Sequence, residues 1–174
     1  MKKILTAVCA AVLLMVCSIE GYSKDEYKIT YDKETGKYHS YYEDGKAFER
    51  GILLNDKKQG EWFIYYENGN IKEKAVYKDG KKSGEYFYFY ENGQLNYRVT
   101  YEDDKMEGNY VSFDEKSHLK EIVNYAEGKP VGVAFTFYPN GRMKERILHK
   151  NDGTMLKYEY EDDEETRKDI FPEE

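Results

Sequence analysis

Glycine recurs every 24 residues through most of this chain, and similar sequence surrounds each copy. GEWFIYYENG begins at residue 60 and GEYFYFYENG at residue 84, with weaker copies elsewhere. An internal repeat of this length indicates a tandem array, in which each unit covers its neighbour's exposed surface. We therefore predict one repeat domain over residues 24–160. Its units start at Gly36, Gly60, Gly84, Gly108 and Gly132.

Each unit contains two turn sequences. Asn68-Gly69 lies between two runs of aromatic and β-branched residues, a pattern typical of a two-residue β-hairpin turn with positive φ at both central residues. Asp79-Gly80 closes the same unit. Two turns per unit predict two strands per unit. We therefore expect an all-β fold, an elongated antiparallel meander of tandem 24-residue β-hairpins, with no helix after the N-terminal segment.

The alternation of side chains along a strand predicts which residues share a face. Trp62 and Tyr66 fall on one face with Ala75 and Tyr77, and Tyr65 falls on the other. Because the period is even, equivalent positions of successive units return to the same face. Both faces therefore receive aromatic columns, and the second also receives a column of cations. That column is Arg50, Lys74, Arg98 and Arg146.

The N-terminus has the pattern of a secretory signal. Lys2 and Lys3 precede an apolar run that ends at Cys17, and this run is shorter than the roughly 20 residues of a membrane span. We predict a signal peptide over residues 1–23 and export to the periplasm or the medium. Lipid attachment at Cys17 is the alternative, because LMVC resembles a lipoprotein signal. Both cysteines lie in this segment, so the mature chain would contain no disulfide.

The charge of the chain limits its partners. A net charge of −7 argues against nucleic acid, which requires a concentrated basic surface. Membrane association is expected only through the signal peptide or Cys17. Residues 161–174 form a predicted acidic C-terminal tail, since EDDEE lacks the ligand spacing of a calcium loop. Short, charged terminal strands are expected to discourage edge-to-edge association.

No catalytic motif accompanies the repeats. The three histidines occupy different positions of the unit, and no nucleophile, metal or phosphate-binding motif is present. One glutamate position does recur, but an active site is needed only once, so a structural role is favoured over a hydrolase built on this column. We predict a non-enzymatic protein with no catalytic residue, no metal site and no cofactor. The recurring glutamates are Glu49, Glu73, Glu121 and Glu145.

The repeat pattern G-x-W/Y-x-x-Y/F-Y-x-N-G resembles the MORN repeat in its bacterial variant form. Residues 60–80 and 84–101 carry the pattern best, and residues 108–131 lack the turn glycine. The resemblance implies antiparallel hairpin repeats, a binding or scaffold role and no shared catalytic residues. Such bacterial proteins also resemble a group labelled antitoxins, so an antitoxin-like or immunity-like protein is an alternative.

The aromatic residues, 16% of the chain, supply the predicted function. Binding energy at protein interfaces concentrates in a few Trp, Tyr and Arg side chains. We predict a scaffold that binds a protein partner through its aromatic sheet surface. A glycan or cell-wall module using the same rings is the alternative, and packing of these rings in the core is the competing interpretation. The predicted binding centre is Trp62, Tyr66, Tyr77, Tyr86 and Tyr90.

Overall fold

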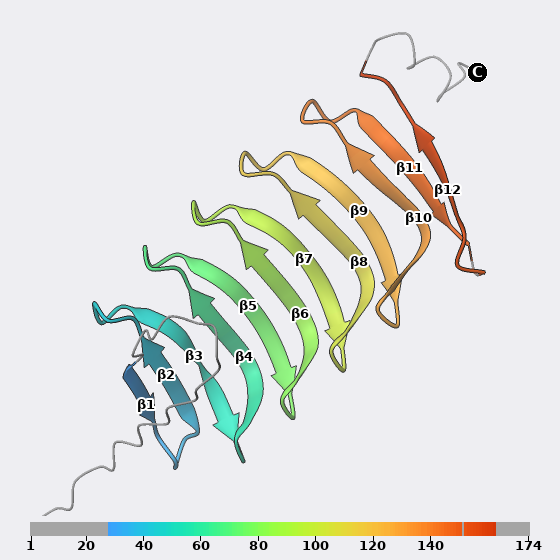
Figure 1. Ribbon diagram of the computed structural model, residues 1–174. Helices are drawn as coiled ribbons and strands as arrows, with labels where there is room; N and C mark the ends of the chain where they lie inside the picture. Colours follow the sequence, from blue (N-terminus) through green and yellow to red (C-terminus); the bar gives the residue numbers. More distant parts are fainter. Residues whose placement is uncertain (1–27, 151, 163–174) are drawn as a thin grey trace, which may run out of the picture.

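A computed structural model describes residues 28–150 and 152–162. These residues form one open antiparallel sheet of twelve strands, ordered in space as they are in the chain, and they contain no helix (Figure 1). The prediction of an all-β meander of tandem hairpins is therefore confirmed. The predicted signal peptide, the lipidation site at Cys17 and residues 163–174 of the predicted tail lie outside the described residues.

The predicted units correspond to the strand pairs β2–β3, β4–β5, β6–β7, β8–β9 and β10–β11, with β1 and β12 as single strands at the two ends. The strands are β1 (Lys28–Tyr31), β2 (Lys37–Tyr41), β3 (Ala47–Leu54), β4 (Lys57–Tyr65), β5 (Ile71–Lys78), β6 (Lys81–Phe89), β7 (Leu95–Glu102), β8 (Lys105–Phe113), β9 (Leu119–Ala126), β10 (Lys129–Phe137), β11 (Met143–His149) and β12 (Met155–Glu159).

The loop at Asn68-Gly69 is not the two-residue turn that its sequence predicted. The Tyr66 N–H donates to the Asn70 carbonyl (2.8 Å) and the Gly69 N–H to the Tyr66 carbonyl (2.9 Å), so the loop holds three residues. Within this loop only Gly69 has a positive φ, 88°. This is the common type I turn followed by a left-handed residue. Asn68 keeps an ordinary φ because its side chain accepts the Asn70 N–H (2.9 Å).

Two-residue turns lie at the opposite ends of the strands, where they close the first four units (Figure 1). At Asp79-Gly80 both residues have positive φ, 53° and 88°, which is the type I′ geometry that matches strand twist. Asp and Asn tolerate the left-handed region better than other side chains do. The equivalent turns are Asn55-Asp56, Asp103-Asp104 and Glu127-Gly128.

The register along each hairpin nevertheless agrees with the prediction. The pairing of β4 with β5 shifts by one residue between Ile64 and Tyr65. This β-bulge offsets the extra loop residue, so Trp62 lies opposite Ala75, as a two-residue turn would have placed it. The predicted faces are therefore correct away from the loop.

Four of the five repeated glycines lie inside strands rather than in turns, and Gly36 directly precedes β2. Gly60, Gly84, Gly108 and Gly132 lie within β4, β6, β8 and β10 with φ of 66°, 139°, 73° and 67°, and pairing with the preceding strand is interrupted beside each one. Such a bulge bends its strand, and a left-handed residue there favours glycine. The 24-residue period thus marks a repeated bend, visible as curvature of the long strands in Figure 1.

The position of Gly69 and Gly93 is occupied by Ser117 in the fourth unit, where the φ of 67° is strained for a residue with a Cβ. Ser117→Gly should therefore raise the free energy of unfolding by about 0.5–1 kcal/mol, because glycine adopts this φ without a steric penalty. Its lost hydroxyl contact with Gln94 is exposed and contributes little. Urea denaturation measures the change.

Gly93→Ser is the matched reverse substitution. A Cβ at Gly93 would meet nothing closer than 3.6 Å, so its effect isolates the backbone conformation. It should lower the free energy of unfolding by about 1 kcal/mol. Changes of the same sign in the two variants would show that backbone conformation does not control these loops.

Candidate binding surface

The bends at the repeated glycines make one face of the sheet concave. Lys58 and Trp62 are four residues apart in β4, on either side of the bulge at Gly60. The Lys58 Nζ lies 4.2 Å from the centroid of the Trp62 ring, and Lys82 covers Tyr86 at 4.3 Å in the next unit, so a cation covers the ring on this side of each bend. We call this concave side, which contains Trp62, Tyr86 and the glutamate column, the carboxylate face.

The carboxylate face holds the core of the sheet. Trp62 is 2% exposed and Tyr86 4% exposed, and small or β-branched residues lie beside them. The Tyr77 ring packs edge-on against Trp62, with centroids 6.3 Å apart. The other buried hydrophobic residues are Ala75, Val99, Val123 and Ala134.

The structure gives every residue of the predicted binding centre a contact within the sheet. The hydroxyl groups of Tyr66 and Tyr90 donate to the backbone carbonyls of Phe89 (2.7 Å) and Phe113 (2.9 Å) in the following unit. Burial leaves Trp62 and Tyr86 almost no surface for a partner. These contacts favour the packing interpretation, and binding of a partner by the group stays a prediction.

The glutamate column accepts hydrogen bonds from the neighbouring aromatic column. The Trp62 Nε1–H donates to Glu49 Oε1 (2.5 Å) and the Tyr86 hydroxyl to Glu73 Oε2 (2.8 Å). Glu49 and Glu73 therefore have a structural role, which weakens the case for a hydrolase built on this column.

The last two glutamates of the column meet different neighbours. At Glu145 the corresponding donor is Lys157, at 3.0 Å. At Glu121 the aromatic position is occupied by Ala134, which has no donor, and burial raises the pKa of the Glu121 carboxyl. The carboxyl of this unit is therefore harder to ionise than that of a free glutamate.

Burial on the carboxylate face also raises the pKa values of its tyrosines. Desolvation, followed by the charges of Glu73 and Glu49, raises the pKa of Tyr77 to about 12. Burial and hydrogen bonding to Tyr97 raise the pKa of Tyr86 as well. Each of these phenols is therefore held neutral in the folded chain at pH values where a free tyrosine ionises.

Alkali should unfold this protein over a defined pH range. A phenol whose pKa is raised by folding contributes stability that is complete below its unfolded pKa, about 10, and is lost as pH rises through its folded pKa. The melting temperature should therefore be steady up to about pH 9 and fall between about pH 10 and 12. Thermal melts followed by circular dichroism, with tyrosinate absorbance, measure this. Ionisation of all tyrosines near pH 10 without loss of melting temperature would contradict it.

The convex side differs in charge from the carboxylate face, and we call it the cationic face. It is defined by the column Arg50, Lys74, Arg98 and Arg146 together with the rings beside it. The register confirms this column, since Arg50 lies opposite Phe63 and Arg98 opposite Phe87. Arg50, Arg98 and Arg146 are all exposed.

Cations outnumber carboxylates on the cationic face between the bulges and the three-residue loops. In the five hairpin units, β2 to β11, strand alternation places eight cations there but only two carboxylates, Glu61 and Glu85. This excess of positive charge contrasts with the net −7 of the whole chain. The eight cations are Lys37, Arg50, Lys72, Lys74, Arg98, Lys120, Lys144 and Arg146.

Aromatic rings on the cationic face are half-buried and lie beneath these cations. The Arg50 guanidinium lies 4.7 Å from the centroid of the Phe63 ring and 5.4 Å from that of Tyr65. Phe63 and Tyr65 stack on each other, as Phe87 and Phe89 do. Accessible rings beside guanidinium groups make a surface that offers both apolar contact and positive charge.

Sequence reasoning placed these cations and rings correctly on one face but assigned no partner to them. The usable signal was the recurrence of arginine in the same column of three units, at Arg50, Arg98 and Arg146. Ile122 occupies this position in the fourth unit, so the strand does not require a guanidinium group there.

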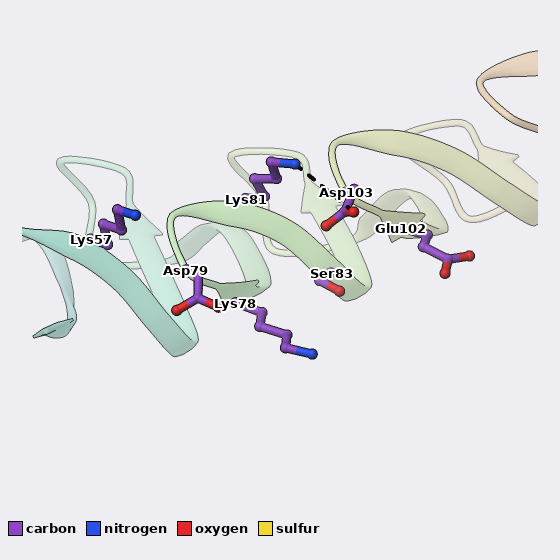
Figure 2. Close-up of a pocket in the computed structure, with 7 residues that line it drawn as sticks. All are labelled: Lys57, Lys78, Asp79, Lys81, Ser83, Glu102 and Asp103. Atoms are coloured by element: carbon purple, nitrogen blue, oxygen red, sulfur yellow. Dashed lines mark ion pairs between the residues drawn. The ribbon is translucent and has the colours of Figure 1, made fainter.

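A hollow of about 460 Å³ lies beside the two-residue turns (Figure 2). Lys81 and Asp103 form a long ion pair there, at 3.9 Å, and Figure 2 shows Lys78 and Glu102 pointing away from that pair. Its charged residues are all exposed and carry both signs, so the hollow lacks the apolar lining of a ligand pocket. It is lined by Lys57, Lys78, Asp79, Lys81, Ser83, Glu102 and Asp103.

The histidines do not gather into a site. His39 stacks on Tyr41, with centroids 6.3 Å apart, and His118 pairs with Asp114 at 2.9 Å. Within residues 28–150 and 152–162, no group of three His, Cys, Asp or Glu residues is arranged to hold a metal ion. The same part of the chain has no helix of the length and apolarity needed to cross a membrane.

Comparison with known proteins identifies the repeat. Residues 58–79, 82–103 and 130–151 match a family described as MORN repeat variant. No curated protein matches the chain.

Solved structures show weak overall similarity to this sheet. An S. aureus TarM mutant in complex with Fondaparinux, alpha-GlcNAc-glycerol and UDP aligns with a TM-score of 0.34 and 12% identity, over 77% of this chain and 21% of TarM. A second TarM structure gives 0.33 and 13% over the same shares. A GtfA/B complex bound to UDP and GlcNAc gives 0.25 and 9%, over 80% of this chain and 25% of that one. The chain thus spans a quarter or less of these structures.

Proposed function

We propose that this MORN-variant repeat protein is a scaffold that binds an acidic protein partner on its cationic face. The observation that carries the proposal is the exposed arginine column beside half-buried rings, on a face whose five hairpin units carry eight cations and two carboxylates. Complementary charge steers association and selects partners. A basic face on a chain of net charge −7 would orient an acidic partner toward this side alone.

The partner's chemistry follows from the two kinds of group on the cationic face. Guanidinium groups bind carboxylates through paired hydrogen bonds, and half-buried rings gain from apolar contact. A polyanion without apolar groups would use the cations and leave the rings uncovered. An acidic polypeptide with aromatic or aliphatic side chains would use both.

The shape of the sheet also suits an extended partner. Equivalent residues of neighbouring units are two strands apart, a spacing of about 10 Å. Arg50, Lys74 and Arg98 therefore form a ladder along which a chain segment could place carboxylates at intervals. An antitoxin-like or immunity-like role would be the case in which this partner is a toxin. We also propose that the scaffold acts outside the cytoplasm, because Lys2 and Lys3 begin the predicted export signal, with lipid attachment at Cys17 as its alternative.

Defined polymers can test the proposal before a natural partner is known. A copolymer of glutamate and tyrosine should bind more tightly than polyglutamate, and both more tightly than the acidic glycan alginate, in fluorescence titrations. Arg98→Glu should weaken binding of the copolymer about tenfold or more, which corresponds to about 1.4 kcal/mol. The measurement is the dissociation constant at fixed ionic strength, since salt screens surface charges.

Lys116→Glu is the matched control. It changes the net charge by the same amount as Arg98→Glu but lies in an exposed loop, so it should leave copolymer binding nearly unchanged. Equal losses in the two variants would reduce the effect to net charge and contradict a specific face. Tightest binding by alginate would instead favour the glycan-binding alternative.

A further inference from the structure

The two end strands carry most of the exposed large hydrophobic side chains. Ile29 and Tyr31 on β1 are 46% and 42% exposed, and Met155, Leu156 and Tyr158 on β12 are 61%, 42% and 49% exposed. The other exposed large hydrophobic residues of the described chain are Ile52 and Leu54 on β3, at 40% and 51%. Five of these seven residues thus lie on the two end strands, where a neighbouring strand is missing.

Both end strands also have one unpaired edge. Within the described residues β1 pairs only with β2, and β12 only with β11. An unpaired edge presents a row of N–H and C=O groups that can accept another strand.

The registers show that the two ends are complementary halves of one unit. Ser40 lies between Ile29 and Glu49, so Ile29 occupies the place of the glutamate column and β1 acts as the second strand of a unit. Glu145 lies between Thr136 and Glu159, so β12 acts as the first strand of a unit. The sheet therefore begins with β1, the second strand of an incomplete unit, and ends with β12, the first strand of another.

We propose that a second copy of the chain continues the sheet, with β12 of one copy pairing antiparallel with β1 of the next. Extending the observed columns places Glu159 opposite Ile29 of the next copy, and Lys157 opposite its Tyr31. This pairing completes a sixth hairpin unit between the two chains, beyond the five units within each chain. It is independent of the partner proposed for the cationic face.

The backbone hydrogen-bonding groups of β1 and β12 are oriented as this pairing requires. The Tyr160 N–H donates to Lys144 and the Asp32 N–H to Lys37. Because hydrogen bonding alternates along an antiparallel strand, the N–H groups of the residues between, including Lys157 and Ile29, point to the free edge. The residues that face each other in the proposed register are thus the ones with free donors and acceptors.

The side chains at the ends would continue the inner columns. Tyr158 would extend the ring column of the cationic face into the next copy, and Ile29 and Tyr31 would extend the carboxylate face. Charges such as Lys28 and Glu159 on short strands are a common means of keeping sheet edges apart, as the sequence analysis expected. Here the uncovered rings and aliphatic groups on both ends favour pairing instead. Since the two edges differ, such contacts form chains of copies rather than a closed dimer.

Two proline variants test the proposal. Each is expressed from the full-length sequence and purified in the form that the cell produces. Ile29→Pro removes a donor from the free edge of β1, and Lys157→Pro one from the free edge of β12, without removing a bond of the existing sheet. Sedimentation velocity should show that the unaltered chain forms larger species as its concentration rises. Each variant alone should stay monomeric, and their equimolar mixture should form a species of two chains, because each supplies the edge that the other lacks.

Three results would overturn the proposal. They are an unaltered chain that stays monomeric at every concentration, a mixture of variants that stays monomeric, or a single variant that dimerises by itself through two identical edges. Circular dichroism checks that each variant is folded. If a proline variant unfolds, Ile29→Lys and Tyr158→Lys replace the pair, with the same outcomes expected.

Discussion

Gly51→Val should lower the free energy of unfolding by about 3 kcal/mol, the upper part of the usual cost of overpacking a core. Gly51 lies on β3 against the indole of Trp62, and a Cβ placed there would be 1.9 Å from a ring carbon. No relaxation of a flexible side-chain end relieves this contact, because the ring is buried. Urea denaturation of the variant and the unaltered chain gives the difference.

A second substitution should restore most of this loss. Tyr86, which occupies the Trp62 position in the next unit, lies between Ala75 and Val99 without conflict. Trp62→Tyr should therefore make room for Val at residue 51. The double variant should be more stable than Gly51→Val alone, which is strong non-additivity between neighbours. Equal stability of the single and double variants would show that Gly51 is not matched to the indole.

Tyr86→Ala should lower the free energy of unfolding by about 3–5 kcal/mol, as expected for truncation of a large buried ring. The ring is 4% exposed and packs against Tyr97 and Tyr101, with centroids 5.7 Å and 5.5 Å away. Its loss would also remove the hydrogen bond to Glu73. Thermal and urea denaturation measure the effect.

Phe87→Ala is the matched control for Tyr86→Ala, because the adjacent residue lies on the cationic face. The Phe87 ring is half-buried, so its truncation should cost clearly less stability while weakening binding of the glutamate–tyrosine copolymer. The opposite result, with stability lost at Phe87 and binding lost at Tyr86, would restore the binding centre first predicted from the sequence.

The strand pairing could be predicted from the sequence because the period is even and turn sequences are local. The kind of loop could not be predicted, since Asn68-Gly69 is compatible with two-residue and three-residue hairpins. The Asn68 side chain, by accepting the Asn70 N–H, stabilises the longer loop. The prediction of the faces remained correct because the bulge beside Tyr65 offsets the extra residue.

Burial could not be predicted in the same way. Alternation places Trp62 and Tyr86 on one face but does not say that this face is concave. Concavity comes from the bulge at Gly60 and its equivalents, and the sequence does not show where a strand bulges. Residues expected on an open surface therefore lie in the core, and the open surface carries Arg98 and Phe87 instead.

Photo-cross-linking in cells tests binding on the cationic face most directly. The photoreactive residue benzoylphenylalanine would replace Phe87 in one variant and Tyr88, on the carboxylate face, in the other. Irradiation should join an acidic protein to the first variant only, and Arg98→Glu should abolish that adduct. Adducts from the Tyr88 position alone, or from neither position, would contradict binding on the cationic face.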